Sequence, residues 1–188
     1  MKNISIISAS VRNGRNSHRV ALYFKNYLEK NQLANVKIID LKEYNFPIFE
    51  ERLRFISDPS GAMLSFASEV TNADGVIIVT PEYNGGYPAS LKNAVDLLYA
   101  EWKRKPIGIA TVSTSVFGGT QVLTSLQFSL WKIGALTVPA MFPVATVEKT
   151  FDENGLPSDQ ATTDKRAAVF VNELIYWIEA KKGVHPSL

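Results

Sequence analysis

Three stretches of the sequence carry residue types that suit an anionic, flat ligand. They are Ser8–Ser17 (SASVRNGRNS), Thr80–Asp96 (TPEYNGGYPASLKNAVD) and Ser113–Thr120 (STSVFGGT). Hydroxyl groups and arginines bind phosphate, and glycines let backbone N–H groups approach a ligand closely. The chemistry to look for is the binding of a phosphorylated small molecule, and the fold must bring the three stretches together.

The first stretch predicts a phosphate cradle. It leads directly into a helix that Asn16 or Ser17 is expected to cap. The unpaired N–H groups and positive dipole end of this helix favour an anion by about 0.3–1 kcal/mol, rising to about 2 when partly buried. Ser10, Arg12 and Ser17 add two hydroxyl groups and a positive charge. The alternative is an ordinary helix start capped by Asn16 or Ser17, with the arginines in solvent.

Other phosphate-binding motifs are absent from the sequence. Without a GxxxxGK[ST] loop, a nucleoside triphosphatase lacks its lysine and its magnesium-binding hydroxyl. A GxGxxG loop is also missing, although Asp40 stands where a dinucleotide fold keeps a ribose-binding acid. A phosphoacceptor domain needs an acidic cluster, whereas Ser8 and Thr80 end the corresponding predicted strands. A single phosphate group held by side chains fits this sequence better.

The second and third stretches suit a planar ring. Two prolines and two glycines constrain residues 81–88, whose backbone amides are expected to face the ring, with Tyr83 and Tyr87 as aromatic walls. In the third stretch, Gly118 and Gly119 allow the main chain to approach a ring edge.

Short apolar, β-branched runs alternate with longer segments of helical period, which is the pattern of βαβ units. This predicts an α/β fold with a doubly wound five-stranded parallel sheet, in the order 2-1-3-4-5, and helices on both faces. Pro139 and Pro143 place the last strand at a sheet edge or require a bulge. The predicted strands are 3–8, 36–40, 75–80, 106–112 and 136–147, and the predicted helices are 17–31, 60–73, 88–102, 119–134 and 163–182.

Length and composition exclude several classes of protein. The chain has 188 residues, is 46% hydrophobic and 20% charged, and carries a formal net charge of +2. This charge is too small for a nucleic-acid-binding surface, so no nucleic-acid partner is expected. The sequence has no cysteine, and no metal site is expected. The absence of a signal peptide and of an apolar run of about 18 residues predicts a cytoplasmic protein that does not bind membranes.

The three stretches together resemble the NADPH-dependent FMN reductase family, whose members are flavodoxin-like enzymes that include quinone, azo-dye and chromate reductases. The resemblance spans residues 3–178 and rests mainly on the spacing of PEYN and LKN..D between Pro81 and Asp96. The chain departs from the family where Ser8-Ala9-Ser10 replaces the usual Gly-Ser. The resemblance implies that residues 1–188 form a single flavodoxin-like FMN-binding domain, with NADPH or NADH as electron donor.

The resemblance also implies which residues bind the cofactor. In the family the first loop holds the FMN phosphate, the PEYN loop borders the flavin ring, and the third loop covers its pyrimidine side. The flavin carries the hydride chemistry, so no side chain is expected to be catalytic. The matching residues of this chain are Ser10, Arg12, Ser17, Pro81, Glu82, Tyr83, Asn84, Ser113, Gly118 and Gly119.

The function implied by the resemblance is that of an FMN-dependent NAD(P)H oxidoreductase. It would pass hydride through the flavin to quinones or similar small acceptors, such as azo compounds, free flavin or chromate, by a ping-pong mechanism. The alternatives are a flavodoxin-type electron carrier and an FMN-binding sensor without NAD(P)H turnover. Such carriers are generally acidic, whereas the sequence pI is about 8.7, which favours the enzyme.

Several smaller features remain hypotheses at this stage. The family forms dimers, so a homodimer or a tetramer is expected through the 88–102 helix, with Trp102 either in the core or at the interface. Trp131 lies on an apolar helical stripe and is expected in the core. His18 is a candidate phosphate ligand, and residues 41–57 are a candidate cover over the site.

Overall fold

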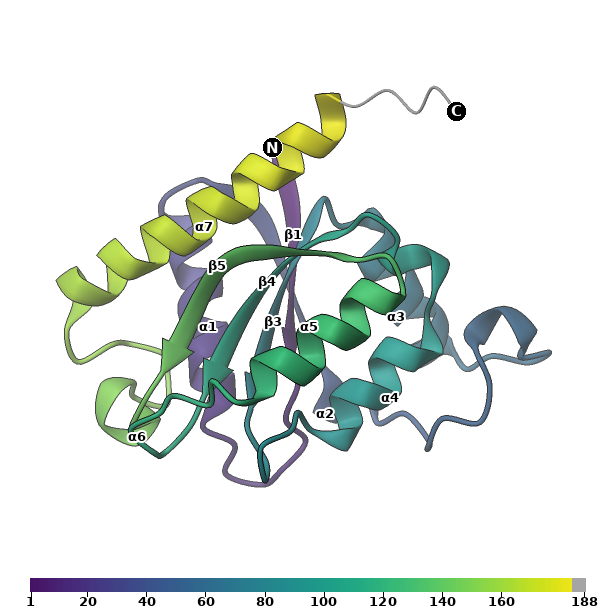
Figure 1. The fold of residues 1–188 in the computed structure, drawn as a ribbon, viewed down its shortest axis with the longest axis horizontal. Helices are drawn as coiled ribbons and strands as arrows, with labels where there is room; N and C mark the ends of the chain where they lie inside the picture. The colour runs from purple at the N-terminus through teal and green to yellow at the C-terminus, as the bar shows by residue number, and fades with distance from the viewer. Residues whose placement is uncertain (184–188) are drawn as a thin grey trace.

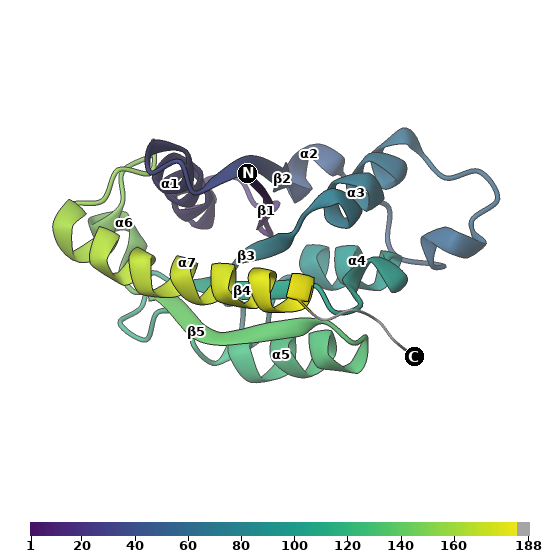
Figure 2. The ribbon, with the colours of Figure 1, turned by 90° about the horizontal axis from the view of Figure 1, so that it is seen from above.

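Five parallel strands form one sheet in the computed structural model, which describes residues 1–183. The strand order is β2-β1-β3-β4-β5. Helices pack on both faces, so the predicted flavodoxin-like fold class and strand order are confirmed (Figures 1 and 2). The strands are β1 (Lys2–Ser8), β2 (Ala34–Asp40), β3 (Gly75–Pro81), β4 (Pro106–Val112) and β5 (Leu136–Val144).

Two hydrophobic clusters lie on opposite faces of the sheet. One packs α1 (Ser17–Lys30) and α7 (Gln160–Gly183) against the strands. The other packs α3 (Gly61–Asn72), α4 (Ala89–Leu97) and α5 (Val122–Lys132) against the opposite face. Because helices cover both sides of the sheet, β3 and β4 in its middle are buried along nearly their whole length. This double burial explains why their sequences are continuous apolar runs.

Among the strands, the main difference from the predicted boundaries lies at the end of β5. This strand ends at Val144 instead of continuing to residue 147. Its position at the sheet edge is as the prolines predicted, and its pairing with β4 shifts register between Ile107 and Ile109, opposite the segment that contains Pro139. The sequence prediction lacks two short helices, which are α2 (Leu41–Tyr44) and α6 (Val147–Thr150).

The predicted 88–102 helix is divided in the structure. α4 ends at Leu97, and Ala100–Trp102 forms a separate 3₁₀ turn. Trp102 is fully buried, and its indole Nε1 donates a hydrogen bond to Val95 O at 3.0 Å, which ties this turn to α4. Trp102 is therefore a core residue.

The prediction that Trp131 lies in the core was wrong. This residue is 65% exposed on α5, beside Phe128, which is 61% exposed, and the two ring centroids are 5.9 Å apart. A different stripe of α5 faces the sheet, so the exposed face of the helix carries two aromatic side chains. The residues that α5 buries are Val122, Leu123, Leu126 and Leu130.

Lys105 is a buried charged residue directly before β4, at the amino end of the sheet. Its Nζ donates hydrogen bonds to Thr71 O, at 3.1 Å, and to Ala73 O, where α3 ends. Burial lowers the pKa of Lys105 from its ordinary value of 10.5 to about 8; the charge of Lys181 lowers this pKa further and that of Asp74 opposes the shift.

Replacing Lys105 by methionine should change the pH dependence of stability. In the folded protein Lys105 loses its proton near pH 8, whereas the unfolded chain keeps it up to about pH 10.5. The unfolded state binds more protons between these values, so the free energy of unfolding should rise with pH there, by up to about 1.4 kcal/mol per pH unit. Urea unfolding between about pH 8 and 9.5 should show this rise in the native chain and not in Lys105→Met. If the free energy of unfolding rose equally with pH in both proteins, the lowered pKa would not belong to Lys105.

Candidate functional site

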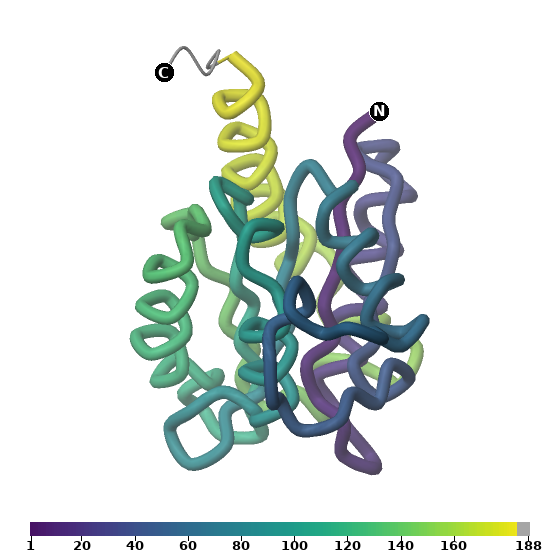
Figure 3. Tube along the Cα trace, turned by 90° about the vertical axis from the view of Figure 1, so that its right-hand side faces the viewer, coloured from purple at the N-terminus to yellow at the C-terminus, as the bar shows by residue number. Residues whose placement is uncertain are grey.

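The three stretches singled out in the sequence meet at the carboxyl end of the sheet. They follow β1, β3 and β4, which are neighbours in the strand order. Figure 1 shows the arrowheads of β4 and β5 pointing to this end, and Figure 3 shows the loops after β1 and β3 extending beyond it. Ligands of open parallel sheets bind at this end, so the topology puts the predicted site where the fold favours binding.

A cavity of about 380 Å³ lies between these loops. Most of the predicted site residues line it, whereas Asn84, Gly118 and Gly119 do not. The predicted residues in the lining are Ser10, Arg12, Ser17, Pro81, Glu82, Tyr83 and Ser113. The other lining residues are Gly14, Arg15, Asn16, Val112, Thr114, Val147 and Glu148.

The first loop brings a hydroxyl group and a positive charge to the cavity. Ser10 is 1% exposed, and its Oγ lies 2.7 Å from Tyr83 Oη. The Arg12 guanidinium lies 5.5 Å from the centroid of the Tyr83 ring, and within residues 1–183 no carboxylate pairs with it. Gly14, with φ of +63°, makes the turn of the loop. Arg12 therefore presents an unneutralised charge beside the cavity.

Ser17 is the most informative residue of the lining. It is 3% exposed, and within residues 1–183 its Oγ is the one buried polar side-chain atom without a hydrogen-bond partner. The expected cap is not formed, because α1 begins without a side-chain cap and Asn16 Nδ2 donates to Glu148 Oε1 at 2.8 Å instead. A buried unsatisfied polar group costs about 1–3 kcal/mol, so this hydroxyl points to a ligand that supplies its partner.

The second loop is shaped by a tight turn at Asn84 and Gly85, whose φ angles are +53° and +78°. On either side of them, Tyr83 and Gly86 exchange two backbone hydrogen bonds, of 2.8 and 3.0 Å. Asn-Gly is favoured in such a turn because both residues need positive φ. The turn leaves Asn84 exposed at its tip and allows Tyr83 to reach the first loop.

Glu82 joins the second loop to the third. Its Oε2 accepts a hydrogen bond from Gln121 N at 3.1 Å, directly before α5. A Cβ atom at Gly119, where φ is +73°, would lie 3.2 Å from Val112 O and 3.4 Å from the Glu82 Cβ. Gly118 packs against β5 and lines a separate hollow. These glycines allow the third loop to pack closely on the sheet, and they do not line the cavity.

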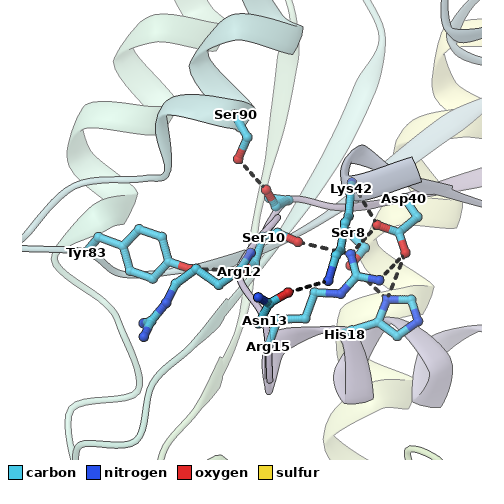
Figure 4. A network of polar contacts seen from close by, with 11 residues as sticks. Ser8, Ser10, Arg12, Asn13, Arg15, His18, Asp40, Lys42, Tyr83 and Ser90 are labelled. Atoms are coloured by element: carbon cyan, nitrogen blue, oxygen red, sulfur yellow. Dashed lines mark hydrogen bonds and ion pairs between the residues drawn. The ribbon is translucent and has the colours of Figure 1, made fainter. Parts of the chain in front are cut away.

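His18 lies beside the cavity and is not part of its lining. Its Nδ1 is 3.0 Å from Ser8 Oγ and 3.7 Å from Asp40 Oδ2 (Figure 4). Burial lowers the pKa of His18, and the charge of Arg15 lowers it further, while the charges of Asp40 and Glu43 oppose the shift. Because its Nδ1 contacts Ser8 and Asp40 and the residue is outside the lining, the structure does not bring His18 to the cavity as a phosphate ligand. Asp40, the candidate ribose-binding acid, is already bound by Arg15.

The segment of residues 41–57 contributes nothing to the cavity lining. Asn93, on α4, holds it by donating to Pro47 O at 2.6 Å and accepting from Phe49 N at 2.5 Å. The segment lines a separate hollow of about 210 Å³.

Three residues of the lining lie outside the three predicted stretches, and they are Val112, the last residue of β4, together with Val147 and Glu148. Val147 and Glu148 belong to α6, and the prediction had continued a strand to residue 147. No motif marks them, because they reach the cavity only through the bend that follows β5.

Residues 1–183 contain neither a metal centre nor a membrane span. No group of three or more histidine, cysteine, aspartate or glutamate side chains in this part of the chain is arranged to hold a metal ion. None of its helices has the length and apolar character needed to cross a membrane.

The strand order and the loops at the carboxyl end define a flavodoxin-like protein. The family model of NADPH-dependent FMN reductases matches residues 2–149. The NAD(P)H-dependent FMN reductase LOT6 of Saccharomyces cerevisiae is 33% identical over 137 residues, which cover 66% of this chain and 71% of that protein. A quinone reductase of Pseudomonas putida is 26% identical over 188 residues, which cover 96% and 97% of the two chains. The chain belongs to the NADPH-dependent FMN reductase family.

A solved structure supports the same fold. FerB, a flavoenzyme NAD(P)H:(acceptor) oxidoreductase from Paracoccus denitrificans, is similar with a TM-score of 0.77 at 23% identity, covering 96% of this chain and 98% of that chain. Family membership makes this chain an oxidoreductase that uses FMN and NAD(P)H. The predicted family, enzyme class and cofactors are confirmed.

Proposed function

We propose that the cavity holds the phosphate of FMN through Ser10, Arg12 and Ser17. The observation that carries this proposal is the partnerless Ser17 Oγ at the uncapped start of α1. A phosphate supplies acceptors for the hydroxyl groups and for the first N–H groups of the helix, and its negative charge matches Arg12 and the helix dipole. The residues of this chain therefore fit the phosphate end of FMN.

The remaining lining residues would border the ring end of the cofactor. Pro81, Glu82, Tyr83 and Ser113 come from the second and third loops and share the cavity with the phosphate-binding residues. The other predicted site residues act on loop shape: Asn84 forms the turn that orients Tyr83, while Gly118 and Gly119 let the third loop pack on the sheet.

We propose that the chain is an FMN-dependent NAD(P)H oxidoreductase that reduces quinones or similar small acceptors. Bound FMN supplies the hydride chemistry, and the protein supplies binding, orientation and electrostatics. The nucleotide donor leaves before the acceptor binds, so turnover is ping-pong. The sequence pI of about 8.7 does not fit a flavodoxin-type carrier, which is generally acidic.

Addition of NADPH or NADH to the FMN-loaded protein under argon tests this function. The enzyme should lose the visible absorption of oxidised flavin and recover it when a quinone is added. Initial rates measured against NAD(P)H concentration, at several fixed quinone concentrations, should give parallel double-reciprocal lines, as ping-pong turnover requires. A protein that binds FMN but keeps its colour with both nucleotides would be a carrier or a sensor, and the proposed enzyme would be wrong.

Replacing Ser17 by alanine should separate ligand binding from stability. Alanine removes a buried hydroxyl group that has no partner, so the protein without FMN should be equally stable or up to about 1 kcal/mol more stable. The FMN affinity should fall by about tenfold, because one hydrogen bond to a charged phosphate is lost. Urea unfolding and fluorescence titration measure the two effects. Lower stability with unchanged affinity would show a purely structural hydroxyl.

We also propose a cytoplasmic homodimer, or a tetramer built from it. The sequence predicts this contact on the 88–102 helix. In that segment α4 exposes Lys92 and pairs it with Asp96, whereas α5, which lies beside α4 (Figure 1), exposes Phe128 and Trp131. We therefore place the proposed contact on α5 instead. An apolar patch of this kind suits a symmetric contact better than a paired polar face. Light scattering should give a dimer for the native chain and a monomer for Phe128→Ser/Trp131→Ser. A monomeric native chain would remove the proposal.

A further inference from the structure

An ion pair lies beneath the first loop, almost out of contact with solvent. The side chain of Asp40, the last residue of β2, is 5% exposed, and that of Arg15 is 15% exposed. The two terminal guanidinium nitrogens of Arg15 donate to the two carboxylate oxygens of Asp40 (Figure 4). Because the contact is bidentate, it fixes the orientation of both side chains as well as their separation.

The same pair is tied to the loop at two places. Arg15 Nη1 also donates to Ser10 O at 3.1 Å, so the guanidinium holds the backbone of a residue that lines the cavity. Asp40 Oδ1 accepts a hydrogen bond from Lys42 N at 3.0 Å, and Lys42 Nζ donates to Asn13 Oδ1 at 3.0 Å. The end of β2 and the start of α2 therefore hold both limbs of the loop.

The loop uses its arginines in two different ways. The charge of Arg15 is neutralised by Asp40, whereas no carboxylate pairs with Arg12 in the part of the chain that the structure describes. A buried ion pair contributes little net stability, because desolvation of the two charges offsets their attraction. Stability alone is therefore a poor explanation for the pair.

We propose that Arg15 and Asp40 are positioning residues of the phosphate site, an inference that rests on the proposed FMN-binding function. They hold the first loop in the shape that brings Ser10, Arg12 and Ser17 to one cavity. In this proposal Arg15, although it lines the cavity, positions the loop and is not a phosphate ligand, because three of its five N–H donors go to Asp40 and to Ser10 O.

The substitution Asp40→Asn should change FMN affinity in opposite directions, depending on whether Arg15 positions the loop or binds the phosphate. If Arg15 positions the loop, the substitution loosens the loop, and FMN affinity should fall by about tenfold, as for the loss of one charge-assisted hydrogen bond. If Arg15 were a phosphate ligand, the substitution would release its guanidinium and remove a nearby negative charge, so FMN affinity should rise. A rise in affinity overturns the proposal.

Titrations with FMN and with riboflavin, followed by quenching of flavin fluorescence, measure this effect. Riboflavin lacks the phosphate, so the ratio of the two affinities reports phosphate binding alone. In Asp40→Asn and in Arg15→Lys the ratio should fall about tenfold, while riboflavin affinity stays within about twofold of the native value. A lysine keeps the charge but does not bridge both carboxylate oxygens, so Arg15→Lys tests geometry apart from charge. A merely structural role would lower both affinities equally.

Two more variants complete the experiment. Arg15→Met/Asp40→Leu replaces the buried pair by apolar side chains, a change that folded proteins often tolerate. This double variant also removes the bond from Lys42 N to Asp40, so it should stay folded with a loss of about 0.5–2 kcal/mol in the free energy of unfolding and show the same reduced ratio. It therefore decides the matter even if Asp40→Asn does not fold. As a matched control, Glu179→Gln breaks an exposed ion pair with Lys2 and should leave both affinities unchanged.

The outcomes separate this inference from the function on which it rests. A native chain that binds neither flavin would contradict the proposed FMN site. A native chain that prefers FMN over riboflavin, together with an unchanged ratio in every Arg15 and Asp40 variant, would contradict only the positioning role.

Discussion

Arg12→Ala is expected to weaken FMN binding by about 10- to 100-fold, with little change in riboflavin binding. The Arg12 guanidinium stands beside the cavity without a carboxylate partner in residues 1–183. A hydrogen bond to a charged group contributes about 1.5–3 kcal/mol, and each 1.4 kcal/mol corresponds to about tenfold in affinity. Fluorescence titration of the purified protein, freed of flavin and refolded if necessary, measures the change.

Lys30→Ala is the matched control for this substitution. Lys30 is an exposed residue in the last turn of α1, so its replacement removes the same charge at the end of the helix that lies away from the first loop. The control should bind FMN like the native chain. Equal losses in the two variants would indicate a long-range charge effect, and unchanged FMN retention in Arg12→Ala would contradict the proposed phosphate site.

Gly155→Ala is expected to lower the free energy of unfolding by about 2 kcal/mol or more. Gly155 lies between α6 and α7, where this segment crosses α1, and its φ is +80°. A Cβ atom there would lie 2.6 Å from Arg19 O and 2.7 Å from Tyr23 N. Both atoms belong to the helix backbone and yield less readily than a side chain. Strained φ values and overpacking each cost about 1–3 kcal/mol.

The control for Gly155 is Gly61→Ala. Gly61 begins α3, and a Cβ atom there meets nothing within 4 Å. Alanine favours the helix by up to about 1 kcal/mol, so this variant should be equally stable or slightly more stable than the native chain. Urea unfolding compares the three proteins. A Gly155→Ala variant as stable as Gly61→Ala would show that the segment moves away from α1 at little cost.

The strands of the sheet were the most predictable part of the molecule. β4 has the predicted bounds, because a strand covered on both faces must be a continuous apolar run. The end of β5 was less predictable, since its last residues bend away into α6 where the neighbouring strand no longer pairs with them. Trp131 was misplaced because helical period reveals apolar stripes without revealing which stripe the sheet covers.

In the candidate site, too, local features were predictable from the sequence and long-range contacts were not. The family motifs were sufficient to identify the three loops and to name the cofactor, because each motif is a local run of residues. The partners of the polar side chains were not available from any local run, as the caps expected at Asn16 and Ser17 show.

The three arginines of the first loop and of α1 show the difference between what the sequence determines and what the tertiary structure decides. Arg12, Arg15 and Arg19 look alike in a run of small and polar residues. In the folded chain Arg12 has no carboxylate partner within residues 1–183, Arg15 binds Asp40, and Arg19 donates to Phe151 O at 2.9 Å. These partners lie 25 and 132 positions away along the chain, so the role of each arginine depends on which segments the sheet brings side by side.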